Sequence, residues 1–173
     1  MQLRARRSAQ PLGHSMGILD LFSRPDVVHP DLGRLRWRHR VWIGSVGDIE
    51  FRLHGGKSGP TSHDVEQLTE ALKNLPTLKK VTSQEVFEHY TAYRDADDTG
   101  LILGTDEPLP NISEPGAVWE HTFEHVLRIG PYRDPGEVEL CFTVAWDIEH
   151  TLGALFKGAE LVELCASILL PKS

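Results

Sequence analysis

The chain has 173 residues, of which 40% are hydrophobic and 25% charged, and it carries a net charge of −7. This size and composition suit one globular domain with a hydrophobic core and exclude disorder over most of the chain. The acidic balance argues against a nucleic-acid-binding protein, and no run of about 20 apolar residues is present to form a membrane-spanning helix.

The first 30 residues are expected to form a disordered or loosely packed leader, followed by a single domain over residues 31–170. Arg4, Arg6 and Arg7 are not followed by an apolar core, so this segment does not resemble a secretory signal. We therefore expect a cytoplasmic protein. Residues 16–18, Met-Gly-Ile, read as an internal translation start, which makes residues 1–15 a candidate for a non-native extension.

Residues 31–41 alternate between apolar and basic side chains, which predicts a strand with one basic face. After a turn expected over residues 44–48, residues 49–53 alternate again, so the two segments should pair as a hairpin. The pattern ends in the Gly- and Pro-rich stretch 55–60. The basic face consists of Arg34, Arg36, Arg38 and Arg40.

Charge is unevenly divided along the chain. Residues 1–58 hold ten basic and five acidic side chains, a net +5, whereas residues 59–173 hold eight and twenty, a net −12. The basic strand has two interpretations: it binds an acidic partner or phosphates through arginine forks, or it pairs with acidic neighbours and keeps an edge strand soluble. We favour the second.

Two amphipathic helices are expected in the middle of the chain. Thr61 and Asp64 have capping-box spacing, as do Thr82 and Glu85, and apolar stripes follow each pair. Pro76 should end or kink the first helix. Residues 95–115 are rich in Asp, Pro and Gly and predict a long loop.

The last third of the chain returns to a two-residue period. Strands are predicted over residues 118–127, 138–146, 151–156 and 161–169, and their short connections require antiparallel pairing. The predicted fold class is α+β: an antiparallel β-sheet, made of the hairpin plus a C-terminal meander, with two central amphipathic helices packed on it. Cys141 and Cys165 fall within these strands and are expected to be reduced and buried.

A short match to a zinc-protease motif lies in this region. His121, Glu124 and His125 have the H-x-x-E-H spacing, in which both histidines ligate zinc from one helical turn. On a strand, positions i and i+4 lie about 13 Å apart, too far for one metal ion. Because the pattern alternates, we expect two half-buried histidines and neither metal nor cofactor. A metal-binding hydrolase that also uses His150 is the alternative.

A second cluster consists of Trp146, Asp147, Glu149 and His150 at a predicted strand-to-strand turn. These side chains can orient an imidazole, bind a cation or act as an acid–base pair. The alternative is structural, since aspartate stabilises turns by accepting hydrogen bonds from backbone amides two residues ahead. We favour the structural interpretation.

The string Trp146–Gly153, read W-D-I-E-H-T-L-G, resembles the W-[DE]-x-E-H-G-L strand–turn–strand of a bacterial family of unknown function. Residues 115–121 are similar to the P-x-x-V-W-x-H strand of the same family. The resemblance implies a small, cytoplasmic domain, and some members are similar to immunity proteins that neutralise a toxin by binding it. It implies no catalytic residues.

The function expected from the sequence is therefore binding without catalysis. The partner would be a protein, either basic or a toxin, and we expect neither nucleic acid nor membrane as a ligand. The candidate partner-binding residues are His121, His125, Trp146, Asp147, Glu149 and His150.

Overall fold

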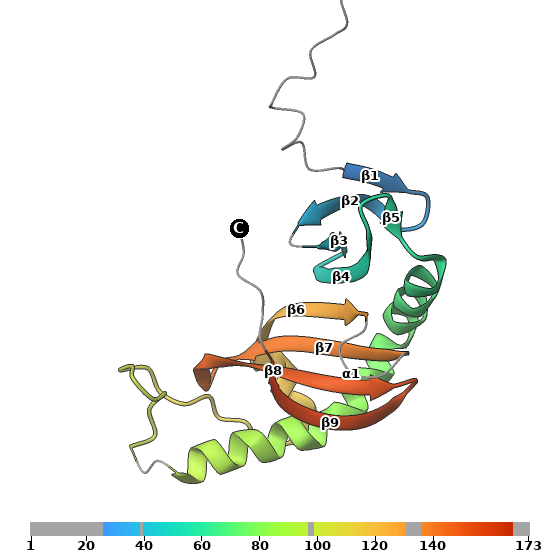
Figure 1. The fold of residues 1–173 in the computed structure, drawn as a ribbon. Coiled ribbons are helices and arrows are strands. Elements are labelled where there is room, and N and C mark those ends of the chain that lie inside the picture. Colours follow the sequence, from blue (N-terminus) through green and yellow to red (C-terminus); the bar gives the residue numbers. More distant parts are fainter. Residues whose placement is uncertain (1–25, 39, 97–98, 131–135, 168–173) are drawn as a thin grey trace, which may run out of the picture.

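The computed structural model describes residues 26–38, 40–96, 99–130 and 136–167 (Figure 1). The expected extension over residues 1–15 lies outside this part of the chain. The elements are β1 (Asp26–His29), β2 (Gly33–Arg38), β3 (Val41–Val46), β4 (Ile49–Gly56), β5 (Gly59–Pro60), α1 (Ser62–Ala96), the 3-10 helix η2 (Pro115–His121), β6 (Thr122–Ile129), β7 (Glu137–Val144), β8 (Asp147–Lys157) and β9 (Glu160–Ser167).

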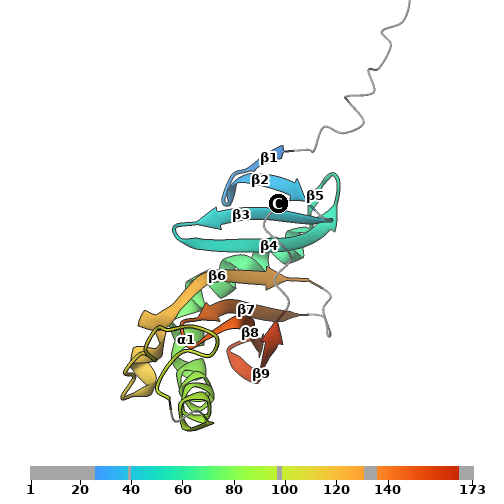
Figure 2. The ribbon, with the colours of Figure 1, turned by 90° about the vertical axis from the view of Figure 1, so that its left-hand side faces the viewer.

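The strands form one sheet in the order β1-β2-β3-β4-β6-β7-β8-β9, with β5 paired to β4. The predicted meander is confirmed, because β6 to β9 follow one another in antiparallel pairs. One pair, β4 with β6, is parallel. Such a pair needs a long crossover, and α1 with η2 supplies it. The α+β class is confirmed, and the sheet is mostly antiparallel (Figure 2).

The N-terminal half of the sheet contains more strands than predicted. The strand expected over residues 31–41 is divided between β2 and β3, and Arg40 between them has φ 67°. The turn expected over 44–48 is shorter, since β3 continues to Val46 and Gly47 turns the chain at φ 61°. The residues expected to form a leader include β1, so the sheet begins before residue 31.

A single helix replaces the two that were predicted. Its start is as expected, because the Asp64 amide donates to Thr61 Oγ1 at 3.1 Å. The second capping box is wrong: Thr82 lies inside the helix, where its hydroxyl donates to the Leu78 carbonyl oxygen at 2.8 Å. Pro76 lies in the interior, and the helix bends along its length (Figure 1). The buried stripe continues past Pro76, so packing on the sheet compensates for the missing hydrogen bond.

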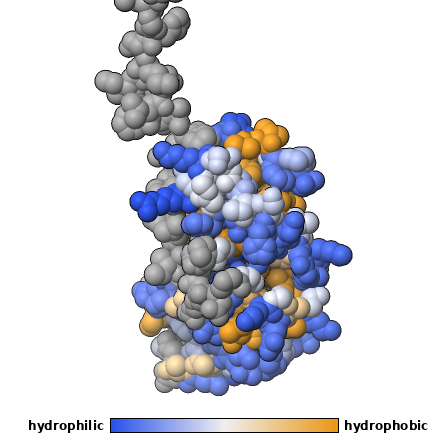
Figure 3. Space-filling model, turned by 45° about the vertical axis from the view of Figure 1, so that its right-hand side comes forward, coloured by the Kyte–Doolittle hydropathy of each residue, from blue (hydrophilic) through white to orange (hydrophobic). Residues whose placement is uncertain are grey.

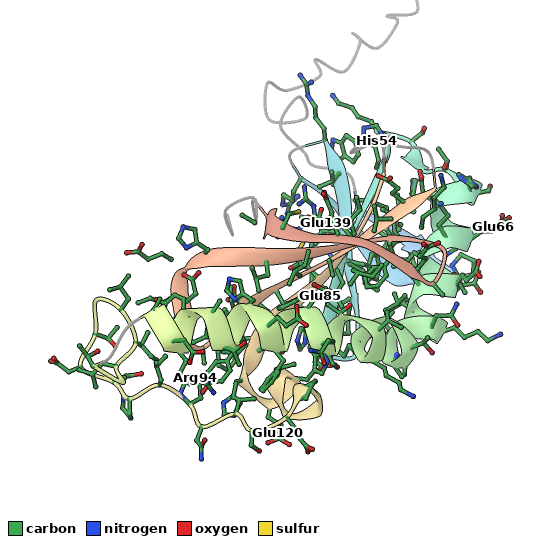
Figure 4. All side chains as sticks on the ribbon, turned by 90° about the horizontal axis from the view of Figure 1, so that it is seen from below. His54, Glu66, Glu85, Arg94, Glu120 and Glu139 are labelled. Atoms are coloured by element: carbon green, nitrogen blue, oxygen red, sulfur yellow. The ribbon has the colours of Figure 1, made fainter. Side chains whose placement is uncertain are left out.

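The core lies between one face of the sheet and the helices. Figure 4 shows α1 in front of the strands, with Glu139 on the sheet and Glu120 on η2. The opposite face of the sheet carries several charged side chains, among them Arg36 and Arg128. The fully buried large side chains of the core include Leu35, Trp42, Phe51, Leu68, Leu78, Leu127, Phe142, Trp146 and Phe156.

The strand predicted from Val118 begins only at Thr122. Residues 115–121 form η2, with Pro115 in its first turn. Trp119 holds this segment against α1, because its indole N–H donates to Ser83 Oγ at 2.9 Å and to the Lys79 carbonyl oxygen at 3.1 Å. The strand prediction is therefore wrong for residues 118–121.

Candidate functional site

The sequence-predicted site residues gather at one end of the meander. The register pairs Thr122 with Val144, and Val144 with Asp147. The Ala145 amide also donates to the His121 carbonyl oxygen at 2.9 Å. The end of η2, the start of β6 and the β7–β8 turn are thus neighbours, and we call this region the meander end.

Trp146 is fully buried beneath the meander end. Its indole N–H donates to Nδ1 of His89, on α1, at 3.0 Å, and its ring meets Tyr90 edge-on at 5.3 Å between centroids. Because the indole can only donate, His89 Nδ1 must accept and the ring proton lies on Nε2. Burial lowers the pKa of His89, with Asp147 acting in the opposite direction, so this histidine is neutral at pH 7.

His89 was not predicted as part of this site. It lies on a helical segment with no motif around it, and only the packing of α1 against the β7–β8 turn brings it to Trp146. No local sequence signal could have identified it.

Asp147 and His150 form a compact acid–histidine pair. Asp147 is buried, and its Oδ1 lies 2.9 Å from His150 Nδ1 and accepts the His150 amide at 3.2 Å. The hydrogen bond and negative charge of Asp147 raise the pKa of His150. The imidazole is exposed, with 61% of its side chain accessible. The pair orders the turn and presents a polar ring edge to a ligand.

His125 occupies a different environment, between Trp119 and Phe142. Its Nε2 lies 2.8 Å from Thr122 Oγ1, and that hydroxyl donates to the Trp119 carbonyl oxygen at 3.1 Å. The hydroxyl must therefore accept from the ring, which places the imidazole proton on Nε2. Burial and then the Lys79 charge lower the pKa of His125 to about 4.

The zinc-protease arrangement is not formed. His121 ends η2, His125 lies in β6, and Glu124 between them has φ 53° at a β-bulge. The two histidines are therefore not one helical turn apart, as that motif requires. Within the described ranges, no group of three or more His, Cys, Asp or Glu side chains is placed to hold a metal ion.

The two cysteines are free thiols on β7 and β9, each paired in register with Gly153 of β8 between them. Residues two strands apart lie roughly 9–10 Å apart, too far for a disulfide. Cys141 is buried, and burial raises the pKa of its thiol to about 11. This thiol is protonated at pH 7 and is a poor nucleophile. Cys165 is only partly buried.

The outer surface of the meander end combines apolar and acidic side chains. Phe123 is 50% exposed and Ile148 is 62% exposed. Glu120, Glu124 and Glu149 are exposed and lie within three residues of them in the chain. On the face drawn in Figure 3, hydrophilic residues predominate, with groups of hydrophobic residues between them.

The fold and this surface define a small α+β domain with acidic, histidine and exposed apolar side chains at one end of its sheet. The chain belongs to the family described as a domain of unknown function, DUF6985, whose model matches residues 32–167. The resemblance to a family of unknown function is confirmed at that level. No curated protein and no solved structure matches the chain. None of the helices in the described ranges combines the length and apolar character needed to cross a bilayer.

Proposed function

We propose that this chain is a non-enzymatic protein-binding domain and that the meander end is its binding surface. The observation that carries the proposal is the exposure of Phe123 and Ile148 at one end of the sheet. Large apolar side chains exposed within a polar rim are typical of protein interaction sites, where buried aromatic and aliphatic anchors supply most of the affinity.

The hydrogen bonds beneath this surface favour the same function. Ile148 follows the Trp146–Asp147 step, where the indole is bonded to His89 and the carboxylate to His150. Phe123 follows Thr122, which is bonded to His125 and to the Trp119 carbonyl oxygen. A surface that is ordered before binding loses less conformational entropy when a partner docks.

The charge of this region favours a basic partner. Glu120, Glu124 and Glu149 are exposed and lie within three residues of Phe123 or Ile148 in the chain, and residues 59–173 carry a net −12. Complementary charge accelerates association and discriminates against acidic proteins. A basic toxin neutralised by this surface is the immunity-like form of the proposal.

The test is affinity capture with the full chain, compared with matched variants. The double variant F123S/I148S removes both proposed anchors. The control V28S/V162S replaces two exposed valines on other strands. Val28 of β1 is 78% accessible, and Val162 of β9 is 53% accessible. We expect a protein that is retained by the wild type and the control and is depleted at least tenfold by F123S/I148S. Retention should also weaken when the salt concentration is raised.

Two results would overturn the proposal. One is a retained protein that binds F123S/I148S as well as it binds the wild type. The other is no protein retained by the wild type beyond what the double variant retains.

A further inference from the structure

The face of the sheet opposite α1 carries a second charged region, at β2. Leu35 of this strand is fully buried in the core, so Arg34, Arg36 and Arg38, which alternate with it, project from the other face. Arg36 is in register with Ile43, and Ile43 with Arg52 of β4. Arg52 is in turn in register with Arg128 of β6, so arginines recur in one row across the sheet.

Three arginines of this face are held by carboxylates of the protein. Arg34 Nη2 lies 2.6 Å from Asp26 Oδ2, and Arg52 Nε lies 2.8 Å from Glu50 Oε1. Farther along the row, Arg128 Nη1 lies 2.9 Å from Glu139 Oε2. These three guanidinium groups are therefore already paired within the protein.

Arg36 and Arg38 differ from the other three. Within the described part of the chain, neither guanidinium forms an ion pair, and Arg38 donates one hydrogen bond, to the carbonyl oxygen of Trp37 at 2.9 Å. A guanidinium carries five N–H donors, so the described residues leave most donors of this pair unused. The fold does not require either charge.

The two side chains line a hollow of about 550 Å³ between β1 and β4. Both carboxylates of the hollow, on Asp26 and Glu50, are already bonded to Arg34 and Arg52. The remaining positive charge is therefore concentrated on Arg36 and Arg38. The lining residues are Asp26, Arg34, Arg36, Arg38, Gly44, Ser45 and Glu50.

The spacing of these two arginines fits one compact anion. Alternate residues of a strand lie about 7 Å apart, and two arginine side chains starting from that separation can converge on a single group. Phosphate presents tetrahedral oxygens that accept from two guanidinium forks. A long polyanion fits less well, because its charges would also approach Asp26 and Glu50.

We propose that this hollow binds a single phosphate group, either free inorganic phosphate or the phosphate of a small monoester. Arg36 and Arg38 hold the anion, while the pairing of Arg34 with Asp26 and of Arg52 with Glu50 shapes the hollow around it. This site lies on a different part of the sheet from the meander end and does not depend on its function.

The test is titration calorimetry at constant ionic strength with inorganic phosphate, phenyl phosphate and succinate. The variant R36Q/R38Q removes both forks, and the control K80Q/R94Q removes two charges from exposed positions of α1. We expect phosphate or phenyl phosphate to bind the wild type and the control, and to bind R36Q/R38Q at least tenfold more weakly. Tighter binding of phenyl phosphate would identify a monoester as the ligand, and equal binding would identify free phosphate.

A variant that keeps both positive charges distinguishes bidentate hydrogen bonding by arginine from charge attraction alone. R36K/R38K should retain folding and bind phosphate more weakly than the wild type, since lysine cannot form the bidentate contact. The proposal is overturned by no phosphate binding to the wild type, by equal binding to R36Q/R38Q, or by succinate binding as tightly as phosphate.

Discussion

Arg128 and Arg36 lie on the same face of one sheet, but they occupy very different surroundings. The Arg128 side chain is 11% exposed and its partner Glu139 is 12% exposed. Ser167 joins them, because its hydroxyl donates to Glu139 Oε1 at 2.8 Å and lies 3.2 Å from Arg128 Nη1. Arg36 is exposed, on a strand one place from the edge of the sheet.

The difference shows how burial changes the role of an identical side chain. A charge removed from water must be compensated within the protein, so the ion pair of Arg128 and Glu139 has a structural role. A charge that remains in water costs little and is available to a ligand. The face therefore has a structural part over the meander, where the Arg128 charge is compensated, and an exposed basic part over β2, where we propose the phosphate site.

The largest expected effect is the removal of Glu139. The variant E139A leaves the Arg128 charge in a largely buried position and removes an acceptor from Ser167. We expect the free energy of unfolding to fall by about 3 kcal/mol, as for other broken buried pairs. Urea denaturation measures this loss, and a decrease below about 1 kcal/mol would place the pair with ordinary surface charges.

The next effect is a pH dependence that arises from His125. Its folded pKa of about 4 lies below the ordinary 6.5, so between these values the unfolded chain binds a proton that the folded chain does not. The contribution of His125 to stability is therefore full above pH 6.5 and decreases as the pH falls toward 4, by about 2 kcal/mol once solvent screening of this partly buried group reduces the full effect. Urea denaturation of the wild type and of H125Q across this pH range isolates the contribution of His125. Both proteins contain the same carboxylates, so the effect of these groups cancels in the difference between the two.

His150, also at the meander end, gives stability the opposite dependence on pH. Its raised pKa means that its interaction with Asp147 is present below pH 6.5 and is lost as the pH rises through the folded pKa. An NMR titration should show His125 titrating near pH 4 and His150 above its ordinary range. Both histidines titrating near 6.5 would contradict the described environments.

Substitution of Gly153 tests how closely the side chains of Glu139 and Ser167 are packed in the structural part of the face. A Cβ at this position would overlap Glu139 Oε1 and would lie 2.9 Å from Ser167 Cβ. We expect G153A to lower the free energy of unfolding by about 1–2 kcal/mol through overpacking. The control is G116A, since a Cβ at Gly116 would meet no atom within 4 Å. Equal stability of the two variants would show that Glu139 and Ser167 move aside without cost.

The smallest effect should come from Asp26. It pairs with Arg34, whose side chain is 73% exposed, and exposed pairs contribute about 0–1 kcal/mol. The variant D26A should therefore change the free energy of unfolding by less than about 1 kcal/mol. A loss as large as that of E139A would remove the contrast between the two parts of the sheet.

Local patterns predicted the elements whose own residues decide their conformation. The alternation in Val138–Val144 and the short turns around it are sufficient for an antiparallel meander, and Thr61 is sufficient to cap α1. Local patterns failed at Pro76 and at residues 118–121. In both places contacts with distant residues override the local preference: the core stripe of α1 past Pro76, and the bonds from Trp119 to Lys79 and Ser83.

The sequence by itself determined the α+β class, the basic strand and the acid–histidine residues of the β7–β8 turn, since these follow from residue types and short periods. Only the tertiary structure decided which charges are compensated and which are not. Ion pairs and buried hydrogen bonds join residues such as Trp146 and His89, which are far apart in the chain, and the pairing of strands and the position of α1 select those partners.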